Sequence, residues 1–382
     1  MISENIKYVG VSDRNIDLFE GQYKVPNGMA YNSYVVLGEK TAVIDSVDAF
    51  FGEEWLNNIV SVLGDRAPDY LVVQHMKPDH SANVAVFAEK YPNAVIVATD
   101  KAFTMMNNFF GTDYVNRRII VKDGDSLDLG GRVLNFYTAP MVHWPEVMMS
   151  YEETEKVLFS ADAFGKFGAF DADEDWACEA RRYYFGIVGK YGVQVQTILK
   201  KLAGLEIKTI CSLHGPVLKE DIGYYVNLYD IWSRYSVESE GVVICYTSVY
   251  GNTKKAVFML AKELEALGCK KVAINDLARD DMAEAVEDAF RYGKLVLATT
   301  TYNGDVFPFM REFINELTER GYKERTVGII ENGSWAPMAA KKIKKMFETS
   351  KDIKFTETAV TINSALNDRA IAEIKALAKE II

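Results

Sequence analysis

The chain has 382 residues, of which 49% are hydrophobic and 12% aromatic, and its net charge is −11. This length suggests two or three domains with substantial cores, and the negative charge argues against a general affinity for nucleic acid or anionic membranes. No segment approaches the ~20 apolar residues that a transmembrane helix needs. The N-terminal stretch MISENIKYVG lacks an apolar signal core. We therefore expect a cytoplasmic protein with no membrane segment.

The first 240 residues have mixed patterns. Runs such as YVVLGEKTAVIDS, RVLNFYTAP and EKVLFSADAF are typical of β-hairpins and strands, whereas residues 54–63 and 81–90 have helical periodicity. These patterns predict an α/β or α+β domain with two packed sheets and helices outside them. The order of the strands does not follow from the patterns alone.

Histidine is rare in this chain, and all four histidines follow apolar runs. His75 and His80 lie in HMKPDH, His143 in APMVHWPE and His214 in CSLHGPV. A lone histidine is usually structural, but four histidines confined to strand-end loops indicate one metal site. Pro78 argues against a helix through the first motif, so its histidines are expected to project from a loop.

Two aspartates share this setting. Asp79 lies inside HMKPDH, and Asp162 lies in SADAFG just after the strand-like run VLF. Separate strand-end loops converge on one point when two sheets meet, so these carboxylates are expected to join the histidines. Carboxylate and imidazole together suit iron and zinc.

The polar stretch SRYSVESEG, residues 233–241, separates the two halves of the chain. It predicts a boundary between residues 1–240 and residues 241–382. Beyond it, five strand-like segments alternate with five helical segments, which predicts a doubly wound parallel sheet. The strands are expected at 242–246, 271–275, 295–299, 326–330 and 356–360, and the helices at 253–267, 282–292, 308–320, 338–348 and 368–381. Such sheets bind ligands at the carboxyl ends of their strands.

Three polar loops follow the first, third and fourth of these strands: TSVYGNT (247–253), TTTYNGD (299–305) and ENGSWAP (331–337). The first combines hydroxyls with a helix N-terminus, which suits a phosphate. The other two each carry an aromatic side chain that could flank a flat ring. One such loop is ordinary, but three at the correct strand ends resemble flavodoxin. That resemblance implies FMN, with Thr247, Ser248, Tyr250, Gly251, Asn252 and Thr253 at the phosphate and Thr300, Thr301, Tyr302, Asn303, Gly304, Asn332, Gly333 and Trp335 around the ring.

The two halves together resemble the flavodiiron proteins, also called A-type flavoproteins. The resemblance rests on HxxxDH, HWP, DAFG, LHGP and the flavin loops, and it covers essentially the whole chain. It implies a metallo-β-lactamase-like αββα domain in residues 1–240, followed by a flavodoxin-like FMN domain in residues 241–382. The implied metal ligands, with Asp162 as the bridge, are His75, Asp79, His80, His143, Asp162 and His214. The seventh ligand of the family, the glutamate of HxExDH, corresponds to Lys77.

The family resemblance also implies a function. Members pass electrons from a rubredoxin-like donor through FMN to non-haem iron, which reduces dioxygen to water, nitric oxide to nitrous oxide, or both. They work as head-to-tail homodimers with two irons per protomer, and one or two are expected here. The alternatives are a flavin electron-transfer protein with a vestigial or single-metal site, and a zinc hydrolase of the metallo-β-lactamase kind. The lysine favours the first alternative, whereas the lysine and the flavin domain both disfavour the second.

Lys77 allows two arrangements. An ammonium has no lone pair to offer a metal. If it points inward and bonds to Asp162, it takes the place of one metal, and the His75 and His143 side of the site is weakly filled or empty. Like unit charges ~4 Å apart cost roughly 4 kcal/mol at an effective dielectric of 20. If Lys77 instead extends to solvent, both metals bind, the first more weakly.

Overall fold

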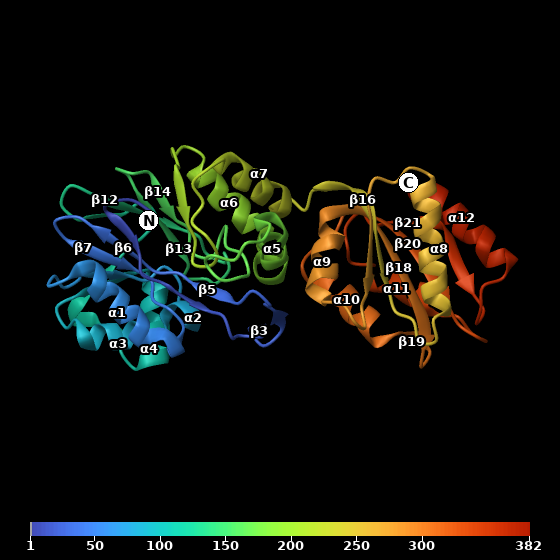
Figure 1. Ribbon diagram of the computed structural model, residues 1–382, viewed down its shortest axis with the longest axis horizontal. Helices are drawn as coiled ribbons and strands as arrows, with labels where there is room; N and C mark the ends of the chain where they lie inside the picture. The colour runs from blue at the N-terminus through green and yellow to red at the C-terminus, as the bar shows by residue number, and fades with distance from the viewer. Residues whose placement is uncertain (1) are drawn as a thin grey trace. The chain divides into compact units, whose positions relative to one another are not determined.

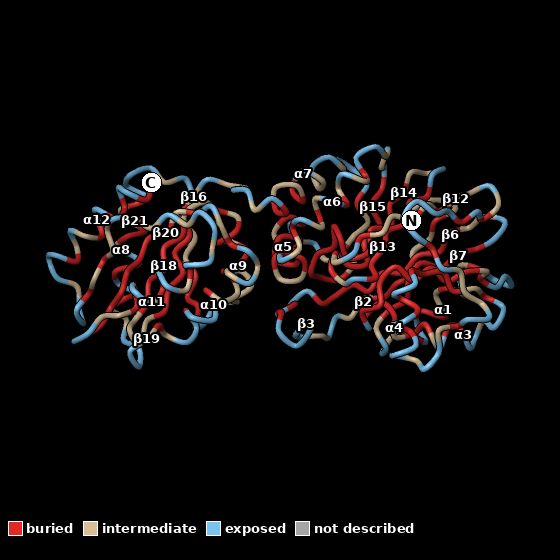
Figure 2. Tube along the Cα trace, turned by 180° about the vertical axis from the view of Figure 1, so that it is seen from behind, coloured by how far each residue is buried: buried red, intermediate tan, exposed pale blue. Residues whose placement is uncertain are grey.

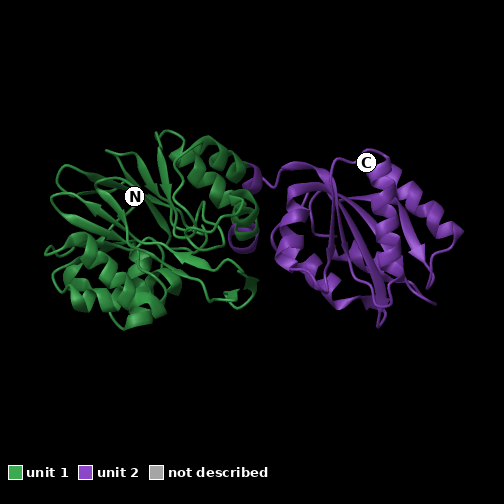
Figure 3. Ribbon diagram, in the orientation of Figure 1, with its two compact units in different colours: residues 1–184, 191–230 green, residues 185–190, 231–382 purple. Residues whose placement is uncertain are grey.

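The structure is a computed structural model that describes residues 2–382. The chain forms two compact units, coloured separately in Figure 3. The first unit runs to Tyr184 and includes Tyr191–Asp230, and the second contains Phe185–Lys190 and Ile231–Ile382. The continuous part of the second unit therefore begins before the polar stretch 233–241. None of the helices in residues 2–382 is long and apolar enough to cross a membrane.

The first unit contains two packed sheets, as the sequence predicted, with helices on their outer faces (Figure 1). One sheet has the strand order β1-β6-β7-β8-β9-β10 and the other β11-β12-β13-β14-β15. Their facing sides share one buried cluster, which includes Tyr34 and Ile44 from one sheet and Phe136 and Phe159 from the other. The buried residues follow the strands in Figure 2.

The elements of this unit are short. Its two sheets contain β1 Ile6–Tyr8, β6 Tyr34–Leu37, β7 Thr41–Ile44, β8 Tyr70–Val72, β9 Val95–Ala98, β10 Arg118–Ile120, β11 Ser126–Asp128, β12 Val133–Thr138, β13 Met148–Glu152, β14 Val157–Phe159 and β15 Thr209–Cys211. Two small ribbons pair β2 Val11–Asp13 with β5 Met29–Tyr31, and β3 Leu18–Phe19 with β4 Tyr23–Lys24. The helices are α1 Gly52–Leu63, α2 Pro78–Ser81, α3 Val84–Lys90, α4 Asp100–Phe110, α5 Trp176–Tyr183, α6 Gly192–Leu202 and α7 Ile222–Ser233, the last of which runs past the end of the unit.

Local sequence explains where these helices begin and end. Thr99 caps α4 by accepting a hydrogen bond from the N–H of Ala102, and the helix stops at Gly111, which has a left-handed φ of 70°. Pro78 opens α2 at its first position, where a proline lacks only an N–H that would have no partner. The expectation that HMKPDH is all loop was therefore wrong, because Pro78 starts a helical turn that carries Asp79 and His80.

The second unit is a parallel sheet in the order β17-β16-β18-β20-β21, with β19 paired antiparallel to β18. The alternation of strands and helices expected from the sequence is confirmed. The chain order reverses between β16 and β18, which is the switch point where such sheets bind ligands. The strands are β16 Ser239–Tyr246, β17 Val272–Asp276, β18 Tyr292–Tyr302, β19 Asp305–Val306, β20 Thr326–Asn332 and β21 Lys354–Ile362.

Helices cover both faces of this sheet (Figure 1). The helix α8 contacts α12 on one face, and α10 contacts α9 and α11 on the other. Val257, Leu260 and Leu264 of α8 are fully buried against the sheet, as their helical spacing predicts. The helices are α8 Asn252–Ala266, α9 Met282–Arg291, α10 Pro308–Glu319, α11 Ala339–Met346 and α12 Asp368–Ile381.

Candidate metal centre and flavin loops

Five segments of the first unit bring the predicted ligands together. His75 lies in the loop after β8, and Asp79 and His80 lie on α2. His143 lies between β12 and β13, whereas Asp162 and His214 follow β14 and β15. Gly165 permits the last two loops to approach each other, because a Cβ there would lie 3.3 Å from Cβ of His214.

The first half-site consists of His75, His143 and Asp162. The Nε2 atoms of the two histidines are 3.4 Å apart, and they lie 3.4 and 3.1 Å from Oδ2 of Asp162. Such separations are those of neighbouring ligands around one ion that sits about 2.0–2.2 Å from each of them. The three atoms can therefore share one metal ion.

The second half-site consists of Asp79, His80 and His214. The Nε2 atoms of its histidines are 3.0 Å apart and lie 3.4 and 3.5 Å from Oδ2 of Asp79. The other oxygen of Asp162, Oδ1, lies 3.2 Å from His80 Nε2 and 3.8 Å from His214 Nε2. Asp162 thus presents one oxygen to each half-site and is placed to bridge two ions.

Hydrogen bonds fix the orientation of two of these imidazoles. Nδ1 of His75 lies 2.8 Å from Oε1 of Glu146, and Nδ1 of His214 lies 2.7 Å from the carbonyl oxygen of Ala30. Both partners are acceptors, so Nδ1 donates to them and Nε2 is directed into the site, where it can bind a metal that displaces its proton. Glu146 also accepts the N–H of Met76, which anchors the loop of His75 to the same carboxylate.

The electrostatic environment of the buried cluster favours binding of a cation. His75, Asp162 and His214 are fully buried. Burial opposes charge on His75, but the carboxylates of Asp162 and Glu146 raise its pKa to about 10. Burial favours neutral carboxyls at Asp79 and Asp162, yet the neighbouring imidazoles hold the pKa of both well below the ordinary value. Two carboxylates therefore stay ionised in a dry site.

Unpartnered oxygens support a metal more directly. Both carboxylate oxygens of Asp162 and Oδ1 of Asp79 are buried and accept no hydrogen bond within residues 2–382. Burying an ionised carboxylate that accepts no hydrogen bond has a large free-energy cost, and a bound cation usually offsets that cost. The donor set, two imidazoles and one or two carboxylates per half-site, suits non-haem iron and also zinc.

Lys77 takes neither of the positions expected from the sequence. Its Nζ lies 2.9 Å from Oδ2 of Asp79 and 3.0 Å from Oε1 of Glu20, and the residue is only 7% exposed. No ion pair joins it to Asp162 among the residues that the structure describes. The lysine therefore neither extends to solvent nor bonds to the bridging carboxylate. It contacts a ligand of the second half-site.

In the second unit, the first polar loop leads into α8. The hydroxyl oxygen of Ser248 accepts the N–H groups of Gly251 and Lys254, at 3.1 and 3.2 Å, which shapes the turn before the helix. The hydroxyls of Thr247 and Thr299 bond at 2.7 Å and tie this loop to β18. The first N–H groups of a helix lack intrahelical acceptors, so this turn suits a phosphate.

The loop after β20 is held by close packing. Asn332 exchanges hydrogen bonds with the backbone of Ser364, which follows β21. A Cβ on Gly333 would lie 2.8 Å from Cα of Pro337, so only glycine fits there. Thr301 accepts the N–H groups of Met338 and Ala339, so its hydroxyl caps the approach to α11. Thr301, which was predicted to lie beside the flavin ring, therefore also stabilises the start of α11.

Aromatic side chains on these loops are exposed. Tyr250 is 92% exposed, Trp335 91% and Tyr302 47%. Meanwhile the hydroxyl of Thr300 is buried without a hydrogen-bond partner in the described chain. Large exposed aromatics beside an unsatisfied polar group are the features of a site that a flat, polar-edged ligand would cover. The loops therefore fit a flavin.

Both parts of the chain are similar to known proteins. Residues 29–215 match the ODP family beta lactamase profile, and residues 243–361 match a flavodoxin domain. The flavodiiron protein from Giardia intestinalis has a TM-score of 0.92 and 25% identity over 99% of this chain and 94% of that one. Over nearly its whole length, this chain is therefore similar to a flavodiiron protein. Rubredoxin oxygen:oxidoreductase from Desulfovibrio gigas is equally similar, with a TM-score of 0.92 and 26% identity over 100% and 97% of the two chains.

The curated relatives are distant in sequence. The nitric oxide reductase of Moorella thermoacetica is 29% identical over 94% of this chain and 92% of its own length. The anaerobic nitric oxide reductase flavorubredoxin of Vibrio vulnificus is 28% identical over 92% of this chain and 74% of its own length. The homologues are thus reductases of nitric oxide or oxidoreductases of dioxygen.

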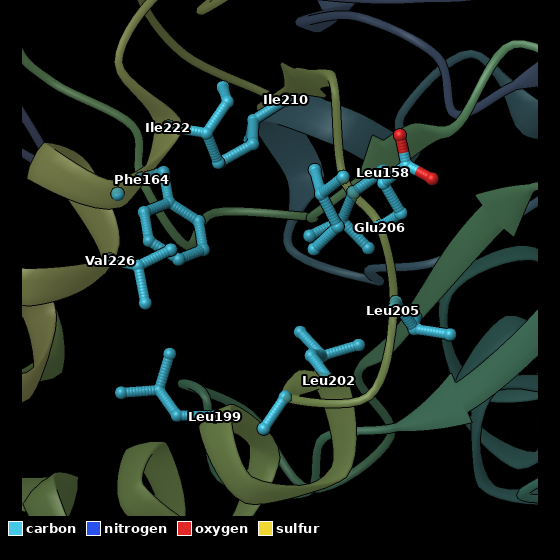
Figure 4. Close-up of a pocket in the computed structure, with 12 residues that line it drawn as sticks. Leu158, Phe164, Leu199, Leu202, Leu205, Glu206, Ile210, Ile222 and Val226 are labelled. Atoms are coloured by element: carbon cyan, nitrogen blue, oxygen red, sulfur yellow. The ribbon is translucent and has the colours of Figure 1, made fainter.

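Figure 4 shows a separate apolar pocket in the first unit. It has a volume of about 410 Å³ and is lined mostly by aliphatic side chains, with Phe164 on one side and Glu206 as its one carboxylate. No ligand of either half-site lines it. The pocket is therefore distinct from the metal centre.

Sequence reasoning missed three carboxylates that contact residues of the candidate metal centre or Lys77. Glu146, three residues after His143, had a signal in the run HWPE. Asp45 accepts the N–H groups of Gln74 and His75, and burial raises the pKa of its carboxyl to about 7. In the sequence, only the position of Asp45 after a strand-like run indicated a role at the site. Nothing in the sequence indicated a role for Glu20, because only the fold brings it to Lys77.

Proposed function

We propose that the protein is a flavodiiron-type oxidoreductase that reduces dioxygen to water, nitric oxide to nitrous oxide, or both. The observation that carries the proposal is Asp162, which presents one buried oxygen, without a hydrogen bond among the described residues, to each of two histidine pairs. A carboxylate in this position could bind two metal ions, and reduction of these gases needs several electrons at one place.

The two units would bind different cofactors. The six side chains His75, Asp79, His80, His143, Asp162 and His214 would hold iron, and the three loops of the second unit would hold FMN. Iron would supply the redox chemistry at the gas, and FMN would accept electrons from a rubredoxin-like donor. A homodimer is the smallest active unit that we propose, following the family.

Aromatic rings lie beside the histidines of the metal centre. The rings of Phe19 and Tyr183 each lie 5.4 Å from the ring of His214, and Trp144 lies 5.4 Å from that of His75. An aromatic wall lowers the local dielectric and strengthens every charge interaction inside it. Tyr183 also has a buried hydroxyl without a partner among residues 2–382, which is free to donate a hydrogen bond.

The test is quantitative analysis of metal and flavin, followed by gas consumption. We expect about one FMN per protomer, iron in at least the second half-site, and consumption of dioxygen or nitric oxide by the reduced protein. A reduced protein that holds FMN and metal but consumes neither gas would contradict the proposal. It would favour a flavin electron-transfer protein, the alternative that the contact of Lys77 with Asp79 supports.

The dimer is tested separately. Mixing a variant that lacks the metal ligands with one that cannot bind FMN should restore gas consumption if electrons pass between protomers. Full turnover by a monomer in dilute solution would refute that part of the proposal.

A further inference from the structure

A two-stranded ribbon, β3 with β4, reaches the second half-site. Its turn contains Glu20, with a left-handed φ of 52°, and Gly21, with a φ of 69°. Phe19, just before the turn, is only 3% exposed and packs edge-on against His214 and against Phe167, at 5.4 and 5.8 Å. The ribbon therefore contacts a metal ligand through its own core residue.

Lys77 joins this ribbon to the metal centre. Its ammonium bonds to Glu20 on the ribbon and to Asp79 on α2, and it lies 4.2 Å from the centre of the ring of Phe19. All three contacts favour the charged form of the lysine. Because the carboxylates belong to different segments, Lys77 is the one cation that ties the ribbon to a ligand of the second half-site among the described residues.

We propose that Glu20 and Lys77 form one positioning unit for the metal centre, in which Glu20 offsets the charge of the lysine and the pair holds the ribbon over the second half-site. The inference rests on the proposed function, since it assumes that the half-sites bind metal. Neither residue is a ligand in this arrangement. Lys77 instead donates to Asp79, whose Oδ2 has a second lone pair available for an ion.

The charges explain why the pair is needed. Asp79 and Asp162 carry −2, and Lys77 alone would reduce this to −1, which weakens attraction for every divalent ion. Glu20 returns the total to −2 without entering either half-site. A buried ammonium with only one carboxylate partner would also leave donors unmatched, and such groups are costly. Glu20 therefore removes most of the penalty of a lysine at this position.

The decisive variant is Glu20→Gln, which keeps the shape of the side chain and removes its charge. We expect ferrous ion to bind about 10-fold more weakly to the full-length protein, as for other groups that support metal ligands. We also expect the backbone amides of residues 18–24 to exchange hydrogen about 10-fold faster, because a partly exposed ion pair that holds the ribbon is lost. The matched control is Lys24→Gln, which changes an exposed charge on the same ribbon and should alter neither quantity.

A double-mutant cycle separates the pair from a general loss of stability. Glu20→Gln and Lys77→Met should each accelerate exchange of the ribbon, and the double variant should exchange no faster than the quicker single variant. Lys77→Arg, which keeps the charge and offers more donors, should retain protection. Additive effects of the two substitutions would overturn the proposal, as would wild-type ferrous affinity in Glu20→Gln.

Measurements of ferrous binding distinguish failure of the proposed function from failure of the pairing of Glu20 with Lys77. If the wild-type protein binds no ferrous ion under anaerobic conditions, the metal centre itself is wrong. If the wild type binds the ion and Glu20→Gln binds it equally well, the metal centre stands and the pairing proposal fails.

Discussion

The metal centre and the flavin loops present their chemistry in opposite ways. The metal centre is a set of buried ionisable side chains, and two of its four histidines are oriented by hydrogen-bond acceptors, Glu146 and the carbonyl of Ala30. The flavin loops rely on backbone groups, glycine conformation and aromatic rings that stay exposed. A single side chain is therefore decisive at the first site, whereas at the second the shape of the loop is decisive and single side chains matter less.

The largest effect is expected for Asp162→Ala, because this carboxylate serves both half-sites. Loss of a direct ligand from each should weaken ferrous binding by at least about 100-fold, while FMN content is unchanged. Anaerobic titration with ferrous ion, read by metal analysis, measures this. The exposed Asp128 is a suitable control, and its alanine variant should bind iron normally. Retention of one tight iron in Asp162→Ala would show that the half-sites are independent.

The next effect concerns Lys77→Glu, which removes the ammonium beside Asp79 and supplies a carboxylate at the position of the glutamate in HxExDH. Ferrous affinity should rise by about 10–100-fold, and iron content should rise toward two per protomer, with gas consumption rising in parallel. The same variant loses the bond to Glu20, so the ribbon of residues 18–24 should exchange faster. Two tightly bound irons in the wild type, and no change in rate on substitution, would contradict this prediction.

Glu146→Gln addresses orientation without touching a ligand. The amide is a weaker acceptor for Nδ1 of His75 than the carboxylate, so the imidazole should be a poorer ligand. We expect about a 10-fold weaker first half-site and an unaffected second one. Competition for metal between the variant and a chelator of known affinity would resolve the two sites, and equal weakening of both would argue for a general structural defect.

At the flavin loops, Gly333→Ala tests backbone shape. The added methyl group would meet Pro337 at 2.8 Å, so the loop must move. Overpacking commonly costs about 1–3 kcal/mol, which corresponds to roughly 10-fold or more in FMN affinity if the loop shift is confined to the site. Fluorescence titration of the apoprotein with FMN measures this, with Ser334→Ala as the neighbouring control. Iron content should not change.

Trp335→Ala should have the smallest effect. The side chain is 91% exposed, so its removal costs the fold little, and stacking on a ring contributes about 0.5–1.5 kcal/mol. FMN should bind about 3–10-fold more weakly, with a shifted visible absorption spectrum. An unchanged affinity and spectrum would place the flavin away from this loop.

The kinds of elements and the ligand types of the candidate site follow from local patterns in the sequence. Strand and helix alternation after residue 241 predicted the parallel sheet, because each helical face and each strand has its own spacing of apolar residues. The four histidines indicated one metal site, because all of them follow apolar runs and are expected in strand-end loops. These inferences need only local periodicity and the ligand preferences of metals.

The pairing of charges, in contrast, depends on how the chain folds. Lys77 is two residues from Asp79 in the chain, yet its second carboxylate, Glu20, is brought by a ribbon far away in sequence. Glu146 and Asp45 likewise reach His75 from other segments. Ion pairs and hydrogen bonds depend on distances of a few ångströms between segments whose separation along the chain carries no such information. The sequence could therefore name the lysine as the unusual residue of this site, but the fold alone determined which partners its ammonium would contact.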